Sequence, residues 1–194
     1  MLSLSKIELN QDLPPDEKID LPPLLEDVTD AMQLKAKAKG MSFSLEQDSK
    51  LPQIFADESQ IRQLLQNLCD NAIKYGNPDS VIDIKVSRTN KIPQSKSFEV
   101  AKGPGVAIAI HNFGEPIATE YLTRLTERFY RMQTHKDKNI KGSGLGLAIV
   151  KHILIRHQGN LRIKPDADGN TFTIYLPLQQ NSDNAMPKLP AKDK

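Results

Sequence analysis

The order of helix-like and strand-like segments is the feature that most constrains the fold of this chain. Apolar residues recur at the helical period in segments 24–39 and 57–75, and again from the glycines near position 144 to about His157. Alternating or β-branched stretches lie between these segments, at residues 41–47, 53–56, 81–88, 106–112, 159–165 and 170–177. Because helices and strands do not alternate strictly, a doubly wound parallel sheet is disfavoured. The sequence predicts an α/β sandwich of the α+β type, in which about three helices cover one face of a mixed β-sheet.

Composition narrows the class of protein. The chain has 194 residues, which is enough for one domain with a hydrophobic core. Its net charge of only +2 argues against a nucleic-acid partner. No apolar run approaches the ~18 residues of a membrane span, so we expect no membrane contact by this chain itself. Cys69 is the only cysteine, which excludes an internal disulfide and favours a reducing, cytoplasmic location.

The chain divides into three parts by pattern. Residues 1–9 have the spacing of the end of a helix whose beginning is absent, and a proline-rich stretch follows, so residues 1–19 are predicted to be a helix remnant and a linker. Residues 20–178 hold the periodic segments and form the predicted domain. Residues 179–194 are polar and rich in proline and lysine, which predicts a disordered tail.

The glycine-rich stretch KGSGLGLAIVKHI raises the possibility of a phosphate site. Gly142, Gly144 and Gly146 run directly into a predicted helix, whose first N–H groups are unpaired and carry partial positive charge. Glycines let such a backbone approach an anion closely. The spacing is neither that of a P-loop nor G-x-G-x-x-G. From the residues alone, a flexible hinge before a core helix is an equally good interpretation.

The helix predicted over 57–75 carries a second group of polar residues. Asp57 is a natural N-cap, and Gln60 completes a capping-box pattern. At ~100° per residue, Asn67, Asn71 and Lys74 lie within about 60° of one another. Neutral carbonyl oxygens suit Mg²⁺ bridged to phosphates, and a lysine suits phosphate charge. The alternative is a solvated polar face, which is common on helices.

Several motifs together resemble one known family. NLCDNAIKYG resembles the N-box of sensor histidine kinases, GSGLGLAIVKHI resembles their second glycine box, and ERFYR resembles the segment between the two. The resemblance covers about residues 20–178 and points to a Bergerat-fold ATPase, the fold that gyrase, Hsp90 and MutL share. LTERFYR with GLGLAIVKHI is most similar to the phosphate-regulon type of sensor kinase.

The resemblance implies ATP and Mg²⁺ as ligands and gives each matching position a role. Asn67 and Asn71 would hold Mg²⁺ with the ATP phosphates, Lys74 would contact phosphate, and these three would be the catalytic residues. Tyr75 would pack beside the adenine. The segment 131–141 would be an ATP lid. The remaining phosphate contacts would come from the glycine box, through Gly142, Ser143, Gly144, Leu145, Gly146 and Leu147.

Two arginines near the lid have open roles. Arg128 and Arg131 are either charge partners for the triphosphate or surface arginines.

The first glycine box departs from the family pattern D-x-G-x-G. The chain reads N-F-G-E-P, with Asn112 in place of the adenine-binding aspartate, Gly114 retained and Pro116 in place of a glycine. Asn112 can still accept a hydrogen bond through its amide oxygen, but the bond is not charge-assisted. Weaker ATP binding or different adenine contacts are therefore expected. Thr126 also replaces the usual phenylalanine before ERF, so the anchoring of the lid is open.

The chain lacks the phosphorylated histidine of the family. Its histidines are His111, His135, His152 and His157, and none has the H-E-L-R-T-P surroundings of the acceptor. We therefore expect this chain to be the catalytic half of a histidine kinase. As a fragment without the hairpin, it is expected to be monomeric. The γ-phosphoryl group would go to a histidine on a helical hairpin outside this chain, and then to a response regulator. In a full-length sensor the domain would lie at the cytoplasmic face of the inner membrane.

Two other functions stay open on the sequence. The altered adenine box would also suit a catalytically weak or inactive ATP-binding regulatory module of the same fold. A serine kinase of the anti-sigma type is disfavoured by the hairpin-like residues 1–9.

Overall fold

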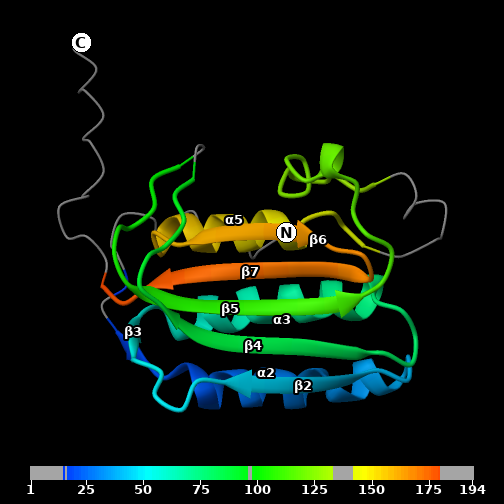
Figure 1. Cartoon of the computed structure of the whole chain (residues 1–194), viewed down its shortest axis with the longest axis horizontal. Helices are drawn as coiled ribbons and strands as arrows, with labels where there is room; N and C mark the ends of the chain where they lie inside the picture. The colour runs from blue at the N-terminus through cyan, green and yellow to red at the C-terminus, as the bar shows by residue number, and fades with distance from the viewer. Residues whose placement is uncertain (1–14, 16, 96–97, 133–141, 180–194) are drawn as a thin grey trace, which may run out of the picture.

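A computed structural model describes residues 15, 17–95, 98–132 and 142–179. The predicted helix remnant at 1–9, most of the predicted lid and the tail from residue 180 lie outside the described residues. The model shows a sheet layer and a helix layer (Figure 1). Among the described helices, none is long and apolar enough to cross a membrane.

The main sheet has five strands in the order β2-β4-β5-β7-β6. Its strands are β2 (Ser42–Gln47), β4 (Val81–Thr89), β5 (Gly105–Phe113), β6 (Asn160–Pro165) and β7 (Gly169–Pro177). β2 pairs with β4 in parallel, and the other neighbours pair antiparallel, so the sheet is mixed. The predicted fold class is therefore confirmed.

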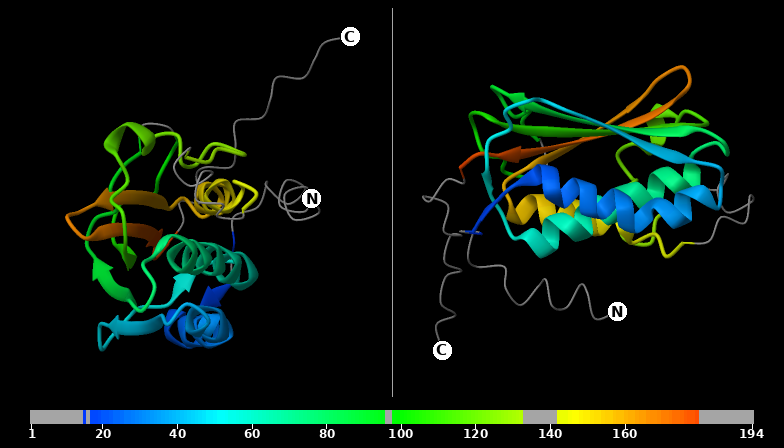
Figure 2. Two further views of the ribbon diagram at one scale, coloured as in Figure 1. Left: turned by 90° about the vertical axis from the view of Figure 1, so that its right-hand side faces the viewer. Right: turned by 90° about the horizontal axis from the view of Figure 1, so that it is seen from below.

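The α-helices lie on one face of this sheet, as Figure 2 shows. They are α2 (Leu21–Lys37), α3 (Glu58–Tyr75) and α5 (Gly146–Arg156), and a short 3-10 helix, η1 (Thr119–Tyr121), follows β5. α3 lies between α2 and α5 and contacts both. Its apolar stripe is fully buried, at Ile61, Leu64, Leu65 and Leu68. The helix with the strongest sequence pattern is thus the centre of the core.

The start of the domain differs from the sequence-based expectation. β1 (Lys18–Ile19) lies in the predicted linker and pairs antiparallel with β3 (Ile54–Phe55), so the short strand expected at 53–56 joins this small sheet and not the main one. α2 begins at Leu21, three residues earlier than predicted, and includes Pro22 and Pro23 in its first turn. Proline is tolerated there because the first N–H groups of a helix need no intrahelical partner.

The N-terminus of α3 is capped in an unexpected way. Asp57 accepts a hydrogen bond from the Gln60 N–H at 3.1 Å, as predicted for an N-cap. The reciprocal half of the predicted capping box is wrong, because the Asp57 N–H donates to His157 Nε2 at 3.1 Å and not to the Gln60 side chain. His157 Nδ1 in turn bonds the Ile153 carbonyl at 2.8 Å. The start of α3 is thereby tied to the end of α5.

Candidate nucleotide-binding site

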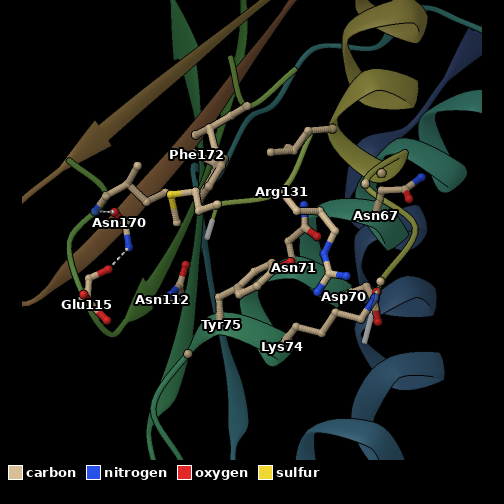
Figure 3. A pocket seen from close by; sticks show the side chains of 18 of the residues that line it. Asn67, Asp70, Asn71, Lys74, Tyr75, Asn112, Glu115, Arg131, Asn170 and Phe172 are labelled. Atoms are coloured by element: carbon tan, nitrogen blue, oxygen red, sulfur yellow. Dashed lines mark hydrogen bonds and ion pairs between the residues drawn. The ribbon is translucent and has the colours of Figure 1, made fainter. Parts of the chain in front are cut away.

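A cavity of about 480 Å³ lies between α3, the start of α5 and the strands β5 and β7. Most of the site residues that the sequence predicts line it: Asn67, Asn71, Lys74, Tyr75, Asn112, Arg131, Gly142, Ser143, Gly144, Gly146 and Leu147. Figure 3 shows Asn67, Asn71 and Lys74 projecting from α3 at one end, with Asn112 and Asn170 at the other. Gly114 and Leu145 are not among the lining residues. The volume is within the range of small-molecule sites in proteins.

The two asparagines of α3 meet the first residue of α5. Asn67 Nδ2 donates to the Gln63 carbonyl at 2.8 Å, which directs Oδ1 away from its own helix. A Cβ placed on Gly146 would lie 3.2 Å from Asn67 Oδ1 and 3.8 Å from Asn71 Oδ1. The glycine at 146 therefore lets two neutral oxygen atoms approach the positive end of α5 closely. This arrangement offers hard ligands for a cation and N–H donors for an anion at one place.

Gly144 is the glycine of the box with the strictest backbone requirement. Its φ is +71°, and a Cβ there would lie 2.8 Å from the carbonyl carbon of Phe129. The Gly144 carbonyl accepts a hydrogen bond from the Phe129 N–H at 3.0 Å. This bond ties the ERFYR segment to the glycine box through backbone atoms, which needs no phenylalanine at position 126. By contrast, a Cβ on Gly142 would meet no atom within 4 Å.

The backbone N–H of Leu145, which the resemblance assigned to phosphate binding, has a local partner. Its N–H donates to Ser143 Oγ at 3.3 Å. Gly146 and Leu147, the first residues of α5, do line the cavity. The start of α5 is thus presented to the cavity, and the predicted phosphate contact of Leu145 stays a prediction.

Lys74 already has a partner on its own helix. Its Nζ lies 2.5 Å from an oxygen of Asp70, one turn earlier, and Lys35 of α2 pairs with the same carboxylate. Burial acts to raise the pKa of Asp70, but these two ion pairs prevail and lower it. Sequence reasoning missed Asp70, although its four-residue spacing from Lys74 was a usable signal. A phosphate bound near Lys74 would have to share this lysine with Asp70.

Lys39 is a second cavity residue that sequence reasoning missed. It follows α2, and its Nζ donates to the carbonyls of Ile73 at 2.7 Å and Lys74 at 3.0 Å. A cation at these carbonyls stabilises the end of α3, where the helix dipole is negative. Burial lowers the pKa of Lys39. No local sequence pattern links residues this far apart in the chain.

The cavity also has an apolar and aromatic lining, and it carries one unusual amide. The apolar and aromatic lining includes Tyr75, Ile117, Met132 and Phe172. Burial raises the pKa of the Tyr75 phenol, although the positive charge of Arg131 acts against this. These side chains suit a flat aromatic group, because such a group gains from apolar burial and ring contacts.

Asn112 is this unusual amide. It is only 2% exposed, and its Nδ2 has no hydrogen-bond partner among the residues that the structure describes. Leaving a buried donor unsatisfied costs about 1–3 kcal/mol. Asn112, a lining residue of the cavity, thus carries a buried donor that the described residues leave without a partner.

Asn170 and Gly114 shape the loop beside Asn112. Asn170 Oδ1 accepts from the Ile117 N–H at 2.8 Å, and its Nδ2 donates to the Glu115 carbonyl at 2.9 Å (Figure 3).

The Gly114 N–H donates to the Asp168 carbonyl at 2.9 Å, and a Cβ on Gly114 would lie 2.8 Å from the Tyr75 carbonyl oxygen. Gly114 is therefore needed for close packing against the end of α3, and its predicted contact with the nucleotide stays a prediction.

Comparison with known proteins agrees with this geometry. Residues 56–180 match the model of the family described as "Histidine kinase-, DNA gyrase B-, and HSP90-like ATPase". The sensor histidine kinase CusS of Escherichia coli O157:H7 is 31% identical over 177 residues, covering 91% of this chain and 34% of CusS. The phosphate regulon sensor protein PhoR of Pseudomonas aeruginosa is 32% identical over 178 residues, covering 91% of this chain and 37% of PhoR. The chain thus spans about a third of the length of these relatives, and the phosphate-regulon relative is not set apart from CusS.

Solved structures share the fold. The full-length histidine kinase ShkA in complex with AMPPNP has a TM-score of 0.69 at 25% identity, covering 93% of this chain and 36% of that one. The nucleotide-free catalytic domain of histidine kinase ThkA has a TM-score of 0.67 at 23% identity, covering 84% of this chain and 96% of that one, and shows the fold alone. The chain therefore belongs to the histidine kinase-, DNA gyrase B- and HSP90-like ATPase family, as an ATP-binding catalytic domain of the sensor histidine kinase type.

Proposed function

We propose that the cavity binds Mg-ATP and presents its γ-phosphoryl group to a histidine on a helical hairpin outside this chain. The observation that carries the proposal is the meeting of two carboxamide oxygens, on Asn67 and Asn71, with the N-terminus of α5 at Gly146. Neutral oxygens and a helix N-terminus are what a cation-bound triphosphate requires. Catalysis of phosphoryl transfer consists mainly of positioning and charge stabilisation, and the acceptor imidazole is itself the nucleophile.

The residues of the chain divide the work between the two ends of the cavity. Asn67 and Asn71 would hold Mg²⁺, which when bound neutralises phosphate charge. The N–H groups at the start of α5 and Lys74 would contact the phosphates, with Asp70 holding Lys74 in place through their ion pair. Tyr75, which lines the cavity, would pack against the base.

The assignment of the metal ligands is tested by Mg²⁺-dependent binding. We expect Asn71→Ala to weaken Mg-ATP binding about tenfold or more, measured by titration calorimetry, because one oxygen ligand is lost. Asn90→Ala is the matched control, since Asn90 lies outside the cavity and exposed, and it should leave the affinity unchanged. Equal affinity of wild type and Asn71→Ala would disprove the assigned site.

One observation favours a second function, that of a catalytically weak regulatory module. The buried amide of Asn112 stands where relatives are expected to carry a charged group, so base recognition is altered. Incubation with labelled ATP and a separately prepared histidine hairpin discriminates between the two functions. Labelled hairpin supports the kinase, whereas tight nucleotide binding without any labelling supports the regulatory module.

The setting of the domain follows from the same proposal. We propose a response regulator as the next phosphoryl acceptor, a cytoplasmic location where ATP is supplied, and a monomeric state for this chain by itself. A solved structure of ThkA contains the response regulator protein TrrA. For the full-length protein we propose a sensor of the phosphate-regulon type, on the LTERFYR and GLGLAIVKHI segments. Phosphate-responsive labelling of the full-length kinase would support it, and labelling that does not respond to phosphate would count against it.

A further inference from the structure

The side chain of Asn112 gives the cavity a feature that its proposed function does not explain. Asn112 lies on β5, opposite Asn170 of β7, and both side chains line the cavity. Asn170 uses its oxygen and its nitrogen in hydrogen bonds to the backbone of the neighbouring loop. Asn112 is equally buried, yet its Nδ2 has no partner among the described residues. The structure thus keeps an unused, buried donor on a side chain at the end of the cavity where the base would lie.

A carboxamide and a carboxylate differ in what they can recognise. An ionised carboxylate only accepts hydrogen bonds, whereas an asparagine offers one accepting oxygen and one donating nitrogen. The two ends exchange places by a half-turn about χ2, which is a broad and roughly two-fold torsion. A carboxamide can therefore match a base edge with either order of donor and acceptor.

Purine bases differ in this order at their 6-position. A 6-aminopurine such as adenine presents a donating amino group beside an accepting ring nitrogen. A 6-oxopurine such as hypoxanthine presents an accepting oxygen beside a donating ring N–H. In one orientation Asn112 complements the first edge, and in the flipped orientation it complements the second, with Nδ2 donating to the 6-oxygen.

We propose, on the basis of the proposed nucleotide site, that Asn112 reads the 6-position of the base and that the site accepts 6-oxopurine nucleotides alongside adenine nucleotides. The apolar and aromatic lining of the cavity does not oppose such a ligand. Tyr75, Ile117, Met132 and Phe172 would contact a base through apolar and aromatic surface, which is tolerant of base identity. Selection at the 6-position thus falls to residue 112.

The test compares Mg-ATP with Mg-ITP, which differ only at the 6-position and its ring proton, by titration calorimetry on the whole chain. For the wild type, the two dissociation constants should agree within about tenfold, because Asn112 pairs with either edge. In Asn112→Asp, the ratio should shift at least about tenfold toward ATP, because a carboxylate cannot donate to the 6-oxygen. Retained Mg-ATP binding by Asn112→Asp shows that this variant folds.

A second variant keeps the test decisive if Asn112→Asp does not fold. Asn112→Ala removes both ends of the amide, so it should weaken ATP and ITP binding by similar factors. Wild-type discrimination against ITP beyond about tenfold, or an unchanged ratio in folded Asn112→Asp, overturns the inference. Binding of ATP without ITP leaves the proposed function intact, whereas binding of neither nucleotide overturns both.

Discussion

His157 should make the stability of this domain depend on pH well above the range in which carboxylates titrate. Its ring is fully buried and joins two helices, with Nε2 accepting from the Asp57 N–H and Nδ1 bonding the Ile153 carbonyl. This pattern requires the neutral ring, because a protonated ring has no acceptor for the Asp57 N–H. The pKa of His157 is lowered to about 4, chiefly by burial; the Ile153 bond and Asp57 act to raise it, and the neighbouring Arg156 acts to lower it.

The magnitude follows from the difference between the folded and unfolded pKa. The unfolded chain takes up the proton near pH 6.5, and the folded protein only near pH 4. Between these values the unfolded chain binds more protons, so the free energy of unfolding falls as the pH falls. Linkage between the two values gives a loss of about 2 kcal/mol from pH 7 to pH 5. The stabilisation is fully present above the unfolded pKa.

Urea unfolding of wild type and His157→Gln, followed by circular dichroism at pH 7, 6 and 5, measures this effect. Glutamine can still accept a hydrogen bond but does not titrate, so His157→Gln should lose most of the pH dependence, whatever its stability at pH 7. His111→Gln is the control, because His111 bonds Thr171 on the sheet and plays no part in the link between α3 and α5. A pH dependence as steep in His157→Gln as in wild type would refute the reasoning.

Three further predictions concern residues around the site. Gly144→Ala, at φ +71°, should destabilise the domain by roughly 1–3 kcal/mol in urea unfolding and weaken Mg-ATP binding. The control Gly142→Ala should change the stability by less than about 0.5 kcal/mol, and equal effects of the two variants would contradict the glycine argument. Burial raises the pKa of the Cys69 thiol to about 12, so iodoacetamide should label the protein at pH 8 only after unfolding in urea. Rapid labelling of the native protein would count against this burial. Lys39→Met should cost about 1–2 kcal/mol through lost bonds to the end of α3, and the exposed Lys37→Met should cost far less, as measured by thermal or urea unfolding.

The sequence determined the elements and the type of site because their signals are local. The apolar stripe of α3 and the alternation of β4 and β5 repeat every few residues, so periodicity located them. Asn67 and Asn71 lie one turn apart, and the glycines stand directly before α5, so their grouping was visible without coordinates. The resemblance of three ordered motifs added the nucleotide, which no single motif would have carried.

The tertiary structure alone decided which distant residues complete these elements. His157 caps a helix that begins 100 residues earlier, and Lys39 caps carbonyls 34 and 35 residues later. β1 pairs with β3, and Lys35 shares Asp70 with Lys74 across two helices. Such contacts depend on the path of the chain through the whole fold, because residues far apart in sequence meet only where packing of the core brings them together. The sequence therefore determined what each segment becomes, and the packed structure decided which partner each polar group finds.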